Sequence, residues 1–82
     1  MTAKEKILHN EYDNVIVYEN PSYDDALVGV TYSTEQAVYD FDLMVEYLMK
    51  LDGISYEDAA DYILYNYTGG KDYPIIMFKL IE

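Results

Sequence analysis

The chain contains no arginine and no cysteine, and it has few lysines. Five lysines face sixteen aspartates and glutamates, so the formal net charge is −11 over 82 residues. The lack of cysteine excludes disulfides and thiolate chemistry. Without arginine, the chain lacks the guanidinium group that phosphate-binding proteins favour, because it binds phosphate through two parallel hydrogen bonds. No apolar run approaches the roughly 18 residues of a membrane-spanning helix, and the first ten residues lack the apolar stretch of a signal peptide. We therefore expect a cytoplasmic protein.

The few cations are also unevenly placed. No lysine occurs between Lys6 and Lys50, whereas this stretch carries nine carboxylates: Glu11, Asp13, Glu19, Asp24, Asp25, Glu35, Asp40, Asp42 and Glu46. Such a field repels nucleic acid and anionic membranes, and it attracts basic surfaces. We therefore expect no direct binding to nucleic acid or to membranes, and we expect a partner with a strongly positive groove.

The composition nevertheless predicts a folded chain. Hydrophobic residues make up 51% and aromatic residues 16% of the sequence, including eleven tyrosines. Acidic chains that stay disordered are poor in aromatic and large aliphatic residues. We expect residues 1–82 to form one domain with a small core, in which residues 1–12 are either a short helix or a mobile arm.

The first half of the chain reads as short strands separated by polar turns. β-Branched residues predict strands, and Asn, Pro, Ser and Asp clusters predict turns. The predicted elements are a strand over Asn14–Glu19, a loop over Asn20–Asp25, a strand over Ala26–Tyr32, a turn over Ser33–Gln36 and a strand over Ala37–Tyr39.

The hydrophobic period changes at Asp40. Apolar residues then follow the stripe of an amphipathic helix: Phe41, Met44, Val45, Leu48 and Leu51. Asp40 is a favourable N-cap, and Gly53 a favourable C-terminal stop. A second helix is predicted from Ser55 to Gly69-Gly70, with Ser55 and Asp58 approximating a capping box.

A last strand is predicted over Tyr73–Ile81, where Pro74 suits the first position. The fold class is therefore α+β: a small antiparallel sheet of three N-terminal strands and the C-terminal strand, packed against a two-helix hairpin. The expected core residues are Val15, Val17, Leu27, Val30, Val38, Phe41, Met44, Val45, Leu48, Ile63, Ile76 and Phe78.

Catalytic motifs are scarce. His9 is the only histidine, and no nucleophile is evidently paired with it. Asp40 and Asp42 form a D-x-D pair, but the calcium-loop pattern is absent, and a helix cap is the simpler role for Asp40. Gly69-Gly70-Lys71 matches neither a Walker loop nor a dinucleotide fingerprint. We expect a protein that is not an enzyme and that uses no metal and no cofactor.

A binding surface is the remaining functional feature. Tyrosine is enriched at protein interfaces, and here it alternates with carboxylates along the predicted helices. A solvated charged face is the simpler explanation for any single carboxylate, but the set has almost no counter-charge. The predicted partner-binding residues are Asp24, Asp25, Tyr39, Asp40, Asp42, Glu46, Glu57, Asp58, Asp61, Tyr62 and Tyr65.

Four segments together form a distinctive pattern: Val38–Met49 (VYDFDLMVEYLM), Gly53–Ala60 (GISYEDAA), Ala26–Val30 and Pro74–Met77. This pattern resembles a family of small proteins from phages and mobile elements of low-GC Gram-positive bacteria, which implies that the protein acts in the cytoplasm of a bacterial host. In size and charge, the chain also resembles acidic phage proteins that mimic DNA, including anti-CRISPR proteins. Neither resemblance brings catalytic residues.

These resemblances imply an anti-defence inhibitor that occludes the basic nucleic-acid-binding surface of a partner, for example a CRISPR effector of the Cas9 type. The alternative is an acidic accessory module that binds a host regulator or a phage structural protein. The sequence does not indicate which acidic face binds, nor the oligomeric state.

Overall fold

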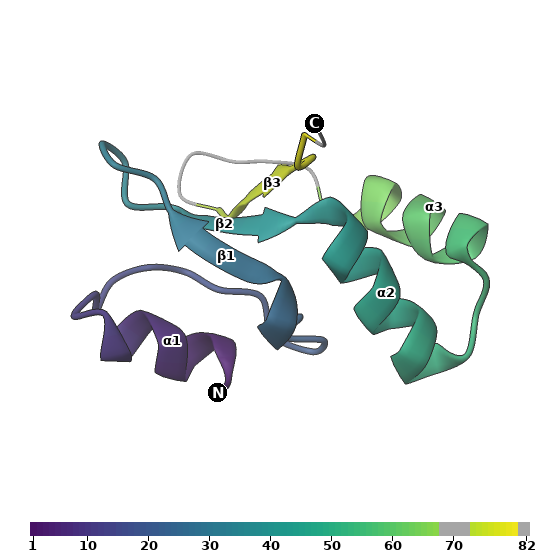
Figure 1. Cartoon of the computed structure of the whole chain (residues 1–82), viewed down its shortest axis with the longest axis horizontal. Helices are drawn as coiled ribbons and strands as arrows, with labels where there is room; N and C mark the ends of the chain where they lie inside the picture. The colour runs from purple at the N-terminus through teal and green to yellow at the C-terminus, as the bar shows by residue number, and fades with distance from the viewer. Residues whose placement is uncertain (68–72, 81–82) are drawn as a thin grey trace.

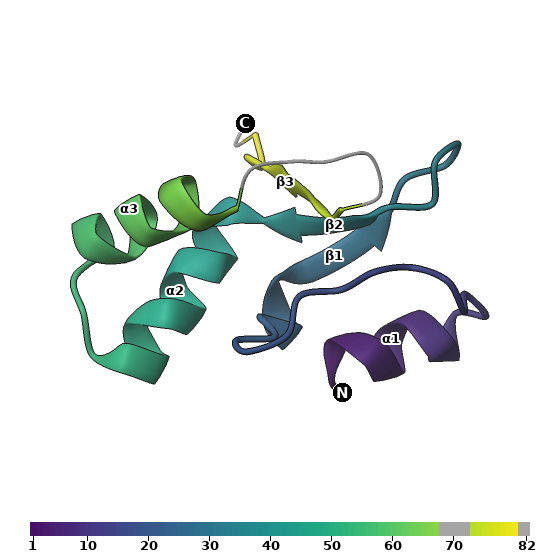
Figure 2. The same cartoon turned by 180° about the vertical axis from the view of Figure 1, so that it is seen from behind.

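The computed structural model describes residues 1–67 and 73–80, and it shows an α+β arrangement of three α-helices and a small three-stranded sheet. In chain order the elements are α1 (Ala3–His9), a 3₁₀ turn η1 (Asp24–Ala26), β1 (Leu27–Val30), β2 (Ala37–Asp40), α2 (Phe41–Asp52), α3 (Tyr56–Asn66) and β3 (Ile75–Met77). The helix pair α2–α3 lies at one end of the sheet, and α1 lies apart from it, near β1 (Figures 1 and 2).

The sheet is mixed, with the strand order β1-β2-β3. β1 and β2 are antiparallel, and a register shift between Leu27 and Gly29 interrupts their pairing. β2 and β3 are parallel, with Val38 opposite Ile75. The prediction of an antiparallel sheet was therefore wrong for β3. The reason is that α2 and α3 form a crossover between the two strands, which parallel pairing requires.

The predicted strand over Asn14–Glu19 is also absent. Within the described residues, no backbone–backbone hydrogen bond joins this segment to a strand. The Tyr18 amide instead donates to the Tyr39 hydroxyl at 3.1 Å. The β-branched residues here are packed as an irregular segment against the core, with Val15, Val17 and Tyr18 half-buried.

The two main helices begin where the sequence predicts. The Asp40 carboxylate accepts a hydrogen bond from the Leu43 amide at 3.2 Å, and Gly53 ends α2 in the left-handed conformation, at φ 65°. Ser55 caps α3 by accepting from the Asp58 amide. α3 ends at Asn66, and the predicted stop at Gly69-Gly70 lies outside the described residues.

The N-terminal segment is a helix, the first of the two alternatives. Thr2 and Glu5 form a capping box, in which the Thr2 hydroxyl accepts from the Glu5 amide and the Glu5 carboxylate accepts from the Thr2 amide. The Lys6 ammonium holds α1 against η1 by donating to the carbonyls of Asp24 and Leu27, at 2.6 and 3.2 Å.

The core lies where α2, the sheet and η1 meet. Six of the predicted core residues are buried: Leu27, Phe41, Met44, Val45, Leu48 and Ile63. Val15, Val17, Val30, Val38 and Ile76 are half-buried. Phe78 is 67% exposed, so its predicted burial was wrong. Its ring packs against Phe41, with 4.8 Å between the ring centroids. Tyr23 and Tyr39 are fully buried, which the sequence did not predict.

Among residues 1–67 and 73–80, no helix combines the length and the apolar character that crossing a bilayer would require.

Candidate functional site

The helix pair carries most of the predicted partner-binding residues on its outer surface. Seven of the eleven are exposed there: Asp42 and Glu46 on α2, and Glu57, Asp58, Asp61, Tyr62 and Tyr65 on α3. Lys50 is the only cation within these two helices. The structure thus brings five exposed carboxylates and two exposed tyrosines onto two neighbouring helices.

Helical geometry explains this placement on α2. Phe41, Met44, Val45 and Leu48 form the buried stripe. Asp42 and Glu46 lie four residues apart on the opposite face, where one turn of helix separates them. On the same outer side, the Tyr56 hydroxyl of α3 lies 3.4 Å from a carboxylate oxygen of Asp42. A long contact of this kind leaves the carboxylate largely open to solvent.

Two predicted contact residues are not on the surface. Tyr39 has an exposed fraction of 0% and Asp40 one of 5%. Tyr39 is enclosed because the irregular segment before η1 covers its face of the sheet, with the Tyr18 ring 4.8 Å away. Asp40 is buried as well, and its carboxylate is engaged in capping α2. Both residues support the fold, and their predicted role in partner contact was wrong.

The other two predicted residues lie in η1. Asp25 is exposed, but Asp24 is half-buried. The Asp24 carboxylate accepts a hydrogen bond from the Ala3 amide at 2.8 Å and so holds the start of α1. η1 packs against α2, but Asp24 is already engaged within the protein.

A tyrosine cluster joins the irregular segment, β2 and the ends of η1 and α3, and it consists of Tyr18, Tyr23, Tyr39 and Tyr67. The hydroxyls of Tyr23 and Tyr67 share a hydrogen bond of 3.0 Å. The Tyr18 ring lies 4.6 Å from the Tyr67 ring, between centroids. Burial raises the pKa of Tyr18 to about 12, and it raises the pKa of Tyr23 well above the usual range of a phenol, with the Tyr67 hydroxyl adding to the shift. The cluster therefore stays neutral at physiological pH.

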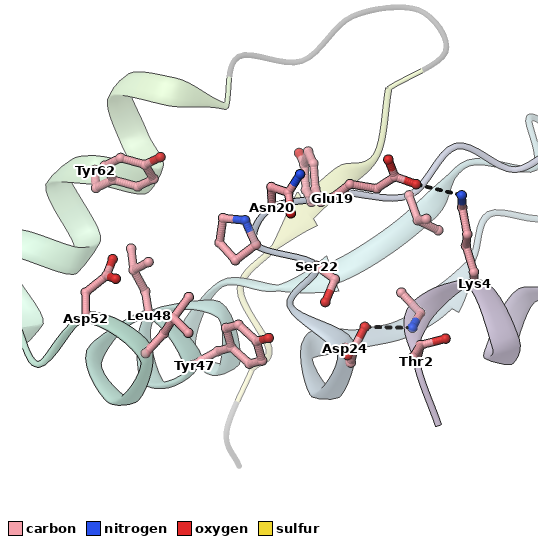
Figure 3. A pocket seen from close by; sticks show the side chains of 15 residues that line it. Thr2, Lys4, Glu19, Asn20, Ser22, Asp24, Tyr47, Leu48, Asp52 and Tyr62 are labelled. Carbon is pink, nitrogen blue, oxygen red and sulfur yellow. Dashed lines mark hydrogen bonds and ion pairs between the residues drawn. The ribbon is translucent and has the colours of Figure 1, made fainter.

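An open groove of about 760 Å³ lies between the helix pair and the N-terminal part of the chain. We call it the α2 groove. One side of the groove is lined by residues 2–4 at the start of α1, by residues 17–22 and by Asp24. The other side is lined by Tyr47, Leu48, Leu51 and Asp52 of α2 and by Tyr62 of α3 (Figure 3). Its volume lies within the range of pockets that bind ligands.

The lining of the α2 groove carries three carboxylates and one lysine. At the end near α1, Lys4 pairs with Glu19 at 2.7 Å, and this hydrogen bond and charge lower the pKa of Glu19. At the helix-pair end lie Asp52, Leu48 and Tyr62 (Figure 3). Asp52 forms no ion pair within the described part of the chain. Asp24 accepts from the Ala3 amide, so Asp52 is the groove carboxylate that is engaged by neither an ion pair nor a hydrogen bond within the described residues.

The sequence reasoning did not single out Asp52, Tyr47 or Leu51 as site residues. One signal for Asp52 was available. It is the last residue of α2, directly before Gly53, where the negative end of the helix dipole disfavours an acid. The groove itself had no sequence signal, because its two sides are more than 20 residues apart in the chain.

Among residues 1–67 and 73–80, no three Asp, Glu or His side chains gather in the way that metal ligands do. Comparison with protein-family models, with curated proteins and with solved structures finds no match to this chain.

Proposed function

We propose that the protein is a non-enzymatic inhibitor that covers a basic, nucleic-acid-binding surface of another protein. The observation that carries this proposal is the outer surface of the helix pair. Asp42, Glu46, Glu57, Asp58 and Asp61 are exposed there, and Lys50 is the only cation within α2 and α3. Phosphates of duplex DNA present about one charge per 1.7 Å of axis. Carboxylates on successive helix turns form a similar row of negative charges, at lower density, which the lysines and arginines of a partner can bind.

Exposed tyrosines support the same proposal. Tyr62 and Tyr65 lie on α3 among its acids, with exposed fractions of 43% and 85%. A tyrosine ring contributes a large apolar contact and stacks on an arginine guanidinium. Interleaved rings and carboxylates therefore suit an arginine-rich groove. A bacterial anti-defence role, with a CRISPR effector as the partner, is the form of this proposal that agrees with the phage-like sequence pattern.

The test is a pull-down from bacterial lysate with mass spectrometry, followed by a competition assay. The purified partner is mixed with labelled DNA and with increasing amounts of the protein. We expect the protein to displace the DNA without binding DNA itself, and its affinity for the partner to fall steeply with salt. If the partner holds DNA and this protein together at full affinity, the occlusion proposal is wrong and the accessory-module alternative replaces it.

Two double variants with reversed charges test whether the outer surface of the helix pair is the binding surface. Asp42→Lys with Glu46→Lys should slow association with the partner, because long-range steering is lost. The matched control is Glu11→Lys with Asp13→Lys, which makes the same change in net charge at exposed positions outside the helix pair. An equal effect of the two double variants would show that net charge, and not the helix-pair surface, drives binding.

A further inference from the structure

The α2 groove has a composition that suits a cation better than any other ligand. Three tyrosines line it, Tyr18, Tyr47 and Tyr62, together with three carboxylates and a single lysine. Lys4 is neutralised by Glu19, and Asp24 accepts from the Ala3 amide. These three charged groups lie toward the α1 side. Asp52 at the opposite end is left as the open anionic group (Figure 3).

The position of Asp52 adds to the negative potential at that end. It is the last residue of α2, beside the carbonyl groups that end the helix. A carboxylate there is unfavourable to the helix, whereas a cation there is favourable. An external cation bound beside Asp52 would therefore interact with the carboxylate and with the helix terminus together.

The neighbouring groups select the kind of cation. Tyr62 presents a partly exposed ring at the same end of the groove, and the Leu51 side chain is also exposed there. A guanidinium is planar, stacks on aromatic rings and binds a carboxylate through two parallel hydrogen bonds. An ammonium ion is more strongly hydrated and lacks the planar face.

We propose that the α2 groove accepts an arginine side chain of the partner protein, with the Asp52 carboxylate as its anionic contact and the Tyr62 ring as its stacking surface. This inference rests on the proposed function for the existence of a basic partner. It adds a defined anchor to the diffuse acidic surface. Anchors of this type, in which an arginine fills a pocket, carry much of the energy of protein interfaces.

The test uses the free protein and a blocked peptide with one arginine between glycine and serine residues. Backbone amide shifts are followed by NMR at low salt while the peptide is added. We expect saturable shifts in residues 47–53, in residues 18–22 and around Tyr62. The same peptide with citrulline, which is neutral and nearly isosteric, should not give saturable binding.

Asp52→Asn should weaken binding of the arginine peptide about tenfold, the lower end of the effect of a charge-assisted hydrogen bond. Asp13→Asn is the matched control, because it removes the same charge at an exposed position outside both the groove and the helix pair. Its affinity should stay within about twofold of the parent protein. Asp52→Asn should remain folded by circular dichroism, since it relieves the unfavourable charge at the helix end.

The proposal is overturned if Asp13→Asn weakens binding as much as Asp52→Asn, if the shifts spread over both helices, or if the arginine peptide does not saturate. The experiments distinguish a failure of the arginine-anchor proposal from a failure of the occlusion proposal. A protein that displaces DNA from its partner equally well with and without Asp52→Asn keeps occlusion and loses the anchor. Peptide binding in the groove without DNA displacement keeps the anchor and loses occlusion.

Discussion

At the residue scale, Tyr39 of β2 holds the irregular segment around Tyr18 against the sheet. The three-residue strand pattern Ala37–Tyr39 suggests one covered face and one open face, and interface preference favours an exposed tyrosine. In the structure the ring is fully buried, and its hydroxyl accepts from the Tyr18 amide. Tyr39 therefore replaces the strand partner that the segment around Tyr18 lacks.

Tyr39→Phe should lower the free energy of unfolding by about 1–3 kcal/mol, because the part-buried Tyr18 amide loses its acceptor. Tyr65→Phe is the control. Tyr65 is 85% exposed, so this change should stay within about 0.5 kcal/mol. Urea denaturation measures both. Equal effects of the two variants would contradict the bonding role of Tyr39.

The tyrosine cluster also predicts the response to alkaline pH. The pKa of Tyr18 is about 12 in the folded protein, and an unfolded tyrosine has a pKa near 10. The folded state therefore keeps a proton that the unfolded state loses. Stability from this group is complete below about pH 10 and falls as pH rises toward about 12.

Tyrosinate absorbance and circular dichroism, measured together from pH 9 upward, test this prediction. We expect some of the eleven tyrosines to ionise only as the fold is lost. In concentrated urea all of them should ionise near pH 10, which is the control. Complete ionisation near pH 10 with the fold intact would contradict the burial of the cluster.

At the element scale, α2 and α3 were predictable because their signals are local. Caps, stops and a 3.6-residue period act within one or two turns of the chain. Residues 1–12 carried a similar signal in Thr2 and Glu5, the capping-box pair of α1. That pair favours the helix over the mobile arm even before the structure is considered.

Asp40→Ala should destabilise the protein by about 1 kcal/mol, with a range of about 0.5–2, because α2 loses its N-terminal cap. Asp40→Asn should retain most of the stability, since asparagine is an equally good cap. Thermal or urea unfolding distinguishes the two. An equally large loss with asparagine would mean that the carboxylate charge, and not the cap, is the important feature.

The strands were less predictable than the helices, since a strand depends on a partner that lies elsewhere in the chain. The Val15–Tyr18 segment has suitable residues, but among residues 1–67 and 73–80 no strand pairs with it through backbone hydrogen bonds. β3 has suitable residues and pairs with β2 in the parallel direction. The predicted element order already allowed parallel pairing of β2 and β3, because the two helices between these strands supply the crossover connection.

At the scale of the whole molecule, the charge is largely uncompensated. Within residues 1–67 and 73–80 the structure contains one ion pair, Lys4–Glu19, and it is exposed. Exposed pairs contribute little to stability. The remaining carboxylates repel one another in the folded state more than in the expanded unfolded chain.

The melting temperature should therefore rise between about 20 and about 300 mM sodium chloride, because salt screens this repulsion. A variant with Asp42→Asn and Glu46→Gln should rise less over the same range, since it has fewer like charges on α2. Differential scanning calorimetry measures both proteins. A melting temperature that falls as salt is added would contradict uncompensated surface repulsion.

The sequence by itself determined α2 and α3, their N-terminal caps, the α+β class and the acidic character of these two helices, because these follow from neighbouring residues and from composition. Only the tertiary structure decided that Tyr39 and Asp40 are buried, that β3 is parallel to β2, and that Asp52 and Tyr62 share a groove with residues 17–22. The physical reason is that burial, strand direction and grooves arise from contacts between distant segments. No local pattern encodes which segments will meet.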